Sequence, residues 1–139
     1  MTATVREAPA SPLSQPLLRA GVVAAIAVAA VAHIPVIAPH LEEAPYMGVL
    51  FIALTAVCLG LGAVIAASGP RWAYQASAAV CGAAVVAYAA TRLVAFPQLA
   101  DDVGNWFEPL GVVSVLSESL VVALALLALR GLRTTAAHV

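Results

Sequence analysis

The sequence predicts an all-α integral membrane protein, an up-down-up-down bundle of four transmembrane helices with both termini in the cytoplasm. Three observations predict this fold: four long apolar runs, charges that lie almost entirely between them, and Arg and acidic residues that alternate between successive connections. A helix needs about 20 apolar residues to cross about 30 Å of hydrocarbon, and it satisfies its own backbone hydrogen bonds there.

The composition supports a membrane location. Of the 139 residues, 63% are hydrophobic and only 9% are charged, whereas soluble domains carry about 25% charged residues. Too few residues remain outside the runs for a separate soluble domain. We therefore predict a flexible cytoplasmic tail over 1–17, one helical domain over 18–133 and a short C-terminal tail over 134–139. The four predicted spans are Ala20–Ala38, Met47–Ala67, Ala73–Ala95 and Leu110–Leu129.

Each connection carries a signal of its own. Pro35 lies inside the first run and predicts a kinked helix near His33. The stretch Ser68-Gly69-Pro70 is typical of a helix end and predicts the turn between the second and third spans. Before the fourth span, Gly104-Asn105 suggests a tight turn, and Pro109 suits the first turn of a helix. The short connections make each helix antiparallel to the one before.

The charges predict the orientation. All six basic residues are Arg, and five of them flank the first span, the 68–72 turn and the end of the fourth span: Arg6, Arg19, Arg71, Arg130 and Arg133. The 39–46 and 96–109 connections hold only acidic charges. By the positive-inside rule, these acidic loops are extracytoplasmic and the protein lies in the cytoplasmic (inner) membrane. The scattered Arg residues do not predict nucleic-acid binding. Val22–Val31 also resembles a signal-peptide core, but the apolar run continues past it.

Three ionisable residues, His33, Arg92 and Glu118, lie inside predicted spans. At about 1.5 Å per residue, all three fall in the outer half of the membrane. Ionisable side chains are costly in hydrocarbon, so they usually face the protein interior or water. Glu118 shares a helix face with Ser114. Two interpretations remain for it: a structural group paired with Arg92 or bonded to Ser, or a proton or cation site.

Arg92 has a second interpretation. Its long side chain can reach outward to an acidic residue of the 96–109 connection, namely Asp101, Asp102 or Glu108. The two cysteines, Cys58 and Cys81, both fall near mid-membrane on consecutive spans. They are interpreted as small buried residues that could be neighbours, and a functional pair is the less favoured alternative.

The predicted outer face gathers imidazole and carboxylate groups. The predicted ligands for a divalent ion, Cu or Zn, are His33, His40, Glu42 and Asp102. Such groups suit these ions, although this spacing is not diagnostic. The alternative is that acidic loops only satisfy topology and solvation. Further candidates for contact with a ligand or partner are Glu43, Arg92, Asp101, Trp106, Glu108 and Glu118. Trp106 also suits an interfacial aromatic belt.

The segments 42–51 and 101–111, together with the Thr91-Arg92 dipeptide, resemble a group of small four-span membrane proteins of high-GC bacteria. The similarity extends from His33 to Leu120. The resemblance implies this fold, a bacterial membrane location and a role for the outer His and acidic residues. It implies no catalytic activity.

The function predicted from these observations is that of a non-enzymatic accessory or binding subunit. Its outer face would engage a metal ion, a small ligand or a larger membrane complex. The alternative is a small proton- or cation-coupled transporter that works as a homo-oligomer through Glu118. No catalytic constellation of recognised spacing is present. Haem held by this chain alone is not expected, because only His33 lies within a span. The predicted partners are the lipid bilayer and other membrane subunits or further copies of the chain.

Overall fold

The structure, a computed structural model, describes residues 14–136, without the side chains of 133–136. It is all-α. The elements are α1 (Gln15–Glu43), α2 (Pro45–Ala67), α3 (Arg71–Leu93), the short 3-10 helix η1 (Ala100–Asp102) and α4 (Pro109–Ala136). All four α-helices are long and apolar enough to cross a membrane. The fold is therefore that of a small multi-pass membrane protein.

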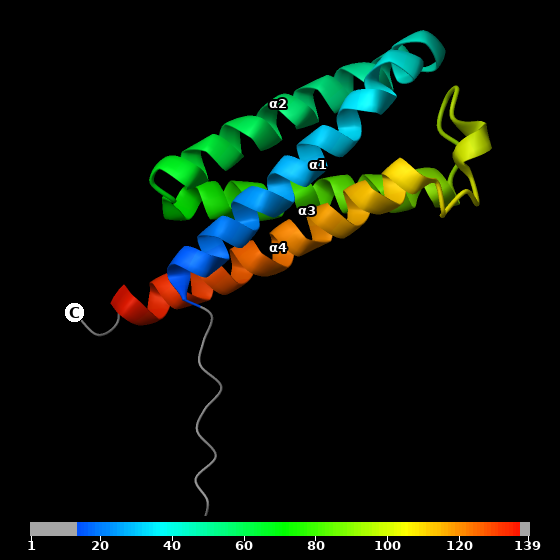
Figure 1. Cartoon of the computed structure of the whole chain (residues 1–139). Coiled ribbons are helices and arrows are strands. Elements are labelled where there is room, and N and C mark those ends of the chain that lie inside the picture. Colours follow the sequence, from blue (N-terminus) through cyan, green and yellow to red (C-terminus); the bar gives the residue numbers. More distant parts are fainter. Residues whose placement is uncertain (1–13, 137–139) are drawn as a thin grey trace, which may run out of the picture.

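The four long helices form one bundle (Figure 1). α1 packs extensively on α2 and on α4, and α3 packs on α4, whereas α2 and α3 have few contacts with each other. The start of α1 and the end of α4 lie together at one end of the bundle, called here the termini end. The corner between α1 and α2 and the 94–108 segment lie at the opposite end, called the capped end.

The first helix is longer than the apolar run that predicts it. α1 has 29 residues and continues through Pro35 and Pro39 to Glu43, so it includes part of the 39–46 connection. Each Pro removes one backbone donor but leaves the other hydrogen bonds of the helix in place. At about 1.5 Å per residue, α1 is about 44 Å long and exceeds the hydrocarbon thickness, so its last turns need not be apolar.

The corner between α1 and α2 is very tight. A single residue, Ala44, separates the helices, and Pro45 occupies the first turn of α2. A Cβ added at Gly48 would lie 2.8 Å from the backbone nitrogen of Leu41. The two backbones therefore approach closely here because position 48 has no side chain.

The turn between α2 and α3 confirms the expected helix end. The backbone N–H groups of Ser68 and Gly69 both donate to the carbonyl of Val64. Gly69 has φ +58°, a left-handed conformation that glycine adopts without a steric penalty. At the same end of the bundle, α4 continues through 134–136, where the sequence predicts a tail. The rest of that tail, including His138, and residues 1–13 lie outside the described residues.

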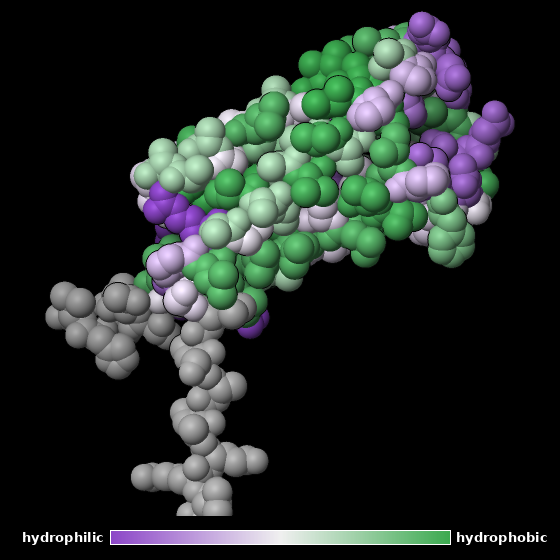
Figure 2. All heavy atoms as spheres, viewed as in Figure 1, coloured by the Kyte–Doolittle hydropathy of each residue, from purple (hydrophilic) through white to green (hydrophobic). Residues whose placement is uncertain are grey.

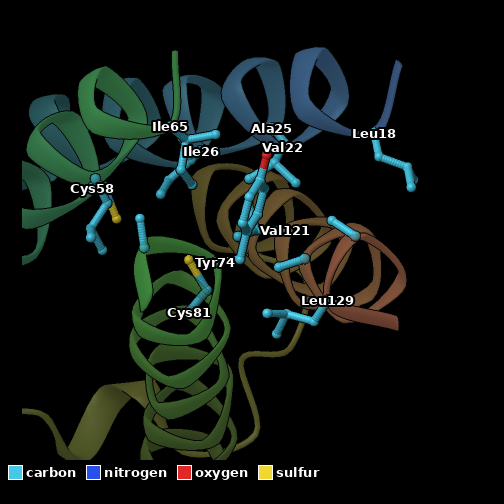
Figure 3. Packing of buried hydrophobic residues seen from close by; sticks show 14 of the residues in the cluster. Leu18, Val22, Ala25, Ile26, Cys58, Ile65, Tyr74, Cys81, Val121 and Leu129 are labelled. Carbon is cyan, nitrogen blue, oxygen red and sulfur yellow. The ribbon is translucent and has the colours of Figure 1, made fainter. Parts of the chain in front are cut away.

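The apolar core lies on the side of the termini end. Figure 3 shows side chains from all four helices meeting there. The larger ones include Leu18, Val22, Ile26, Ile65, Tyr74, Val121 and Leu129, and small residues such as Ala25 and Ala125 fill the space between. Figure 2 shows mainly hydrophobic side chains along the bundle, with hydrophilic residues gathered at its ends. Such a surface suits contact with a lipid bilayer.

Candidate functional site

A cavity of about 590 Å³ lies between the helices on the side of the capped end. All four helices contribute to its wall. Most of its apolar lining belongs to α2 and α3, including Leu50, Leu54, Val57, Val80 and Ala84. Leu50 and Val57 are also exposed on the outside of the bundle. Because the exposed residues of the wall all belong to α2 and α3, the cavity is open on the side of these two helices.

The polar part of the wall contains most of the residues that the sequence singles out. Those that line the cavity are His33, His40, Arg92, Asp102, Glu108 and Glu118. The wall also includes Ser114, which lies one turn before Glu118 as expected. The cavity thus combines a polar part with an apolar part that opens sideways.

His33 of α1 and Glu118 of α4 form a buried pair. Their side chains approach to 3.6 Å between Nε2 and Oε1, and the residues are only 5% and 1% exposed. His33 Nδ1 lies 2.7 Å from the carbonyl oxygen of Ala29. Since a carbonyl only accepts, Nδ1 carries hydrogen and Nε2 faces the carboxyl group. At 3.6 Å the contact is longer than a hydrogen bond, and it is an ion pair when the imidazole is protonated.

Arg92 pairs with Asp102 and not with Glu118. Its Nη1 lies 2.5 Å from Oδ1 of Asp102 and donates to the backbone oxygen of the same residue at 3.1 Å. The guanidinium also lies over the ring of Tyr88, 4.5 Å from the centroid. The structure therefore confirms the second interpretation of Arg92, in which its side chain reaches an acidic residue of the 96–109 connection.

Two polar atoms in the cavity wall lack a hydrogen-bond partner among the described residues. They are Nε of Arg92 and Oε1 of Glu118, and both are buried. A buried polar group without a partner costs about 1–3 kcal/mol, so such groups are normally satisfied by water or by a ligand. Both residues line the cavity, so these two atoms lie just behind its polar wall.

The 94–108 segment covers the capped end and holds the polar wall in place. Gly104 N–H donates to the carbonyl of Arg92 at 2.9 Å, and Gly104 has φ +80°. Asn105 N–H donates to the carbonyl of Asp102 at 3.1 Å, which closes the tight turn expected there. The Tyr88 hydroxyl donates to the carbonyl of Trp106 at 2.9 Å.

This segment is also tied to the corner between α1 and α2. The hydroxyl of Tyr46 donates to the carbonyl of Pro97 at 2.7 Å. The 42–51 and 101–111 segments, which carry the resemblance noted in the sequence, therefore lie at the same end of the bundle and contribute to one cap.

Glu108 has a structural role that the sequence reasoning did not assign. One carboxylate oxygen accepts from Leu110 N–H at 3.1 Å, and the other accepts from Gly111 N–H. These donors are among the unpaired N–H groups at the start of α4, so Glu108 caps this helix. The carboxylate also favours the positive end of the helix dipole.

The remaining candidates lie outside the cavity wall. Glu42, Glu43 and Asp101 are exposed at the capped end. Trp106 is also exposed, and its backbone oxygen accepts from Tyr88.

The predicted metal ligands do not form one cluster. His40 Nδ1 lies 2.8 Å from the carbonyl of Val36, and its ring meets the Phe51 ring edge-on with 4.9 Å between centroids. His33 faces Glu118, and Asp102 faces Arg92. Within residues 14–136, no group of three or more His, Cys, Asp or Glu residues is placed to hold a metal ion. Metal binding at these residues stays a prediction.

The sequence reasoning missed the role of two aromatic residues. Tyr88 supports Arg92, and its signal is the spacing of four residues on one helix, which places both side chains on the same face. Phe51 contacts the rings of both His33 and His40. No local sequence signal indicates that Phe51 contacts two histidines of another helix.

Comparison with known protein families, curated proteins and solved structures finds no match to this chain.

Proposed function

We propose that the protein is a non-enzymatic binding or accessory subunit of the cytoplasmic membrane that holds an amphipathic small molecule in the cavity between α2 and α3. In this proposal the helices alternate in direction across the bilayer, the termini are cytoplasmic and the capped end is extracytoplasmic. The Arg residues near the termini end and the acidic residues near the capped end support this orientation.

One observation supports an amphipathic molecule as the ligand. Two residues of the polar wall, Arg92 and Glu118, each have a buried atom without a hydrogen-bond partner, the donor Nε and the acceptor Oε1, while the exposed apolar residues of the wall lie on α2 and α3. A neutral molecule with a hydroxyl or carbonyl head and an apolar tail satisfies both features. Its head would bond to Arg92 and Glu118, and its tail would lie between α2 and α3 and enter from the bilayer.

A titration with para-nonylphenol tests this proposal. The probe has one hydroxyl and an apolar tail, and n-nonane is the matched molecule without the hydroxyl. We expect purified protein in mild detergent to bind para-nonylphenol, measured by calorimetry, and to bind n-nonane much more weakly.

Glu118→Leu removes the acceptor and keeps a side chain of similar size, so it should weaken binding of para-nonylphenol about tenfold, the value of one buried hydrogen bond. Ser77→Ala is the matched control, because Ser77 is fully buried with an unpartnered hydroxyl but does not line the cavity. Equal binding to wild type and Glu118→Leu, or equal binding of both probes, would contradict the proposal.

Transport is the second candidate function. A buried carboxyl group that faces an imidazole at 3.6 Å is an arrangement suited to moving a proton across the membrane. This observation favours a proton- or cation-coupled transporter that acts as a homo-oligomer. In vesicles with an internal pH-sensitive dye, Glu118→Gln should then abolish substrate-driven proton movement, and Glu108→Gln should not. An unchanged flux in Glu118→Gln would exclude this function.

The predicted divalent ion has a separate test. Elemental analysis of gently extracted protein, beside the double variant His33→Ala/His40→Ala, reports the metal content per chain. Stoichiometric Cu or Zn that is lost in the variant would establish a metal site that depends on these histidines. Wild-type protein without metal would remove the ion from the proposal and leave the amphipathic ligand.

A further inference from the structure

A second cavity, of about 780 Å³, lies at the termini end. It is open to the surroundings of the bundle, because its lining includes the exposed residues Ala20, Ala24 and Ala27 of α1. Among the described residues, it shares no lining residue with the cavity at the capped end. What this cavity binds is therefore a question separate from the proposed function.

The polar end of this cavity is built around Arg19. Its guanidinium donates to the carbonyl of Ala66 in the last turn of α2, and the negative end of that helix dipole favours the cation at this place. A Cβ added at Gly69 would lie 3.0 Å from the Tyr74 hydroxyl and 3.6 Å from Cδ of Arg19. The Arg19 and Tyr74 side chains therefore both lie against the turn between α2 and α3, where Ser68 also lines the cavity.

The apolar end of this cavity follows α1 away from Arg19. It is lined there by one face of the helix, formed by Ala20, Val23, Ala24 and Ala27. Ala27 lies eight residues beyond Arg19, which corresponds to about 12 Å along the helix axis. Because three of these four side chains are single methyl groups, an acyl chain can lie close to the helix along this face.

The charge at the termini end has one sign among the described residues. Arg19, Arg71 and Arg130 lie there, and Figure 2 shows hydrophilic side chains at this end, next to the turn between α2 and α3. Within residues 14–136, the acidic side chains belong to the capped end or, in the case of Glu118, line the cavity there. Arg19 forms no ion pair within that range, so the cavity joins a positive charge to an apolar wall.

We propose that the cavity at the termini end binds one anionic glycerophospholipid of the surrounding bilayer. Its phosphate accepts from the guanidinium of Arg19, whose planar fork of N–H donors suits phosphate oxygens, and from the hydroxyl of Tyr74. One acyl chain lies along α1 as far as Ala27. A zwitterionic phospholipid carries a cation beside the same phosphate, and the positive charge at this end disfavours it.

Native mass spectrometry of the full chain in mild detergent tests the inference, because it counts the bound lipids and gives their affinities. Dioleoyl phosphatidylglycerol and dioleoyl phosphatidylcholine have the same acyl chains and differ in net charge. We expect wild type to bind about one phosphatidylglycerol at least about tenfold more tightly than phosphatidylcholine, as expected for a hydrogen bond to a charged group.

Three Arg variants separate the cavity from the general charge of this end. Arg19→Gln removes the charge and keeps a long polar side chain, so it should lower the affinity for phosphatidylglycerol about tenfold. Arg71→Gln and Arg130→Gln are the matched controls, because both residues are exposed at the same end but do not line the cavity. Each should change this affinity less than about twofold.

A fourth variant tests the apolar end of the cavity. Ala24→Phe places a large side chain at an exposed position of the lining and should weaken binding of both lipids. Glycerol phosphate, the free head-group phosphate, should not displace phosphatidylglycerol at equal concentration. If Arg19→Gln does not fold, the two lipids on wild type still decide the proposal.

Four outcomes would overturn the inference. Equal affinity of wild type for both lipids would remove the preference for negative charge, and equal losses in the three Arg variants would show only diffuse attraction. A lipid-free dimer that Ala24→Phe dissociates would assign the cavity to a second copy of the chain. Displacement by glycerol phosphate would assign it to a soluble phosphate compound. None of these outcomes affects the cavity at the capped end, so the proposed function is tested separately.

Discussion

The buried side chains differ in kind between the two ends of the bundle. On the side of the termini end, the interior is filled by apolar side chains from all four helices, and Val22, Ile65 and Val121 are completely buried. On the side of the capped end, the buried residues include His33, Arg92 and Glu118, and a cavity separates α2 from α3. Both halves carry a cavity, about 780 Å³ and more open at the termini end and about 590 Å³ at the capped end, but only the cavity at the capped end is lined by buried His, Arg and Glu side chains among the described residues.

We infer from this difference that the termini end contributes most to stability and that the capped end holds the functional site. Close packing at the termini end fixes the helices relative to one another. Buried ionisable groups at the capped end are costly in an apolar environment and persist only with partners such as the pairs His33–Glu118 and Arg92–Asp102. A chain that only needed to be stable would fill that volume with apolar side chains.

The largest expected effect tests the apolar core at the termini end. Ile26 is 1% exposed and Ile34, on the same helix, is 53% exposed. Ile26→Ala should lower the free energy of unfolding by about 3–4 kcal/mol, because it removes buried contacts and leaves a cavity. Ile34→Ala should change it by less than about 0.5 kcal/mol. Unfolding in mixed detergent micelles measures both, and equal losses would show that the core is not at this end.

An intermediate effect is expected for the pair that holds the cap. Arg92→Ala removes the ion pair, the bond to the backbone of Asp102 and the contact with Tyr88. It should lower the free energy of unfolding by about 2–3 kcal/mol, below the upper range for buried pairs because Asp102 is partly exposed.

Hydrogen exchange distinguishes a local effect of Arg92→Ala from a global one. Faster exchange should concentrate in the 94–108 segment, whose backbone is bonded to Arg92 through Gly104. Arg71→Ala is the control, since Arg71 is an exposed residue at the other end of α3. If exchange rises equally throughout the bundle, the cap is not a separate unit.

The smallest effect concerns the start of α4. Glu108→Ala removes the acceptor for Leu110 N–H and Gly111 N–H and should cost about 1 kcal/mol of the free energy of unfolding. Asp101→Ala, at an exposed position of the same segment, should cost little. Equal effects of the two variants would mean that charge in the segment matters more than the helix cap.

The helices were predictable from the sequence because length and apolar content decide whether a segment can cross a bilayer. The start of α4 at Pro109 and the turn at Gly69 followed from residue types that suit helix ends. The continuation of α1 to Glu43 could not be predicted in this way, because a helix that extends beyond the hydrocarbon no longer needs apolar residues.

The site was predictable only in part. Counting residues along each span places His33, Arg92 and Glu118 in the same half of the membrane, and all three do line one cavity. The count does not give the rotation of each helix about its axis, so the partner of Glu118 could not be chosen. The cavity itself depends on the separation of α2 from α3, which no local pattern encodes.

The most direct test of the account is to identify the small molecules that stay bound to the protein when it is extracted from its own membrane. Gently extracted wild type, Glu118→Leu and Ser77→Ala would be treated with organic solvent, and the released molecules identified by mass spectrometry. The account predicts about one amphipathic molecule per chain, with an oxygen-containing head and an apolar tail, in wild type and Ser77→Ala but depleted in Glu118→Leu. The same set of ordinary bilayer lipids from all three proteins, with no further molecule, would contradict it.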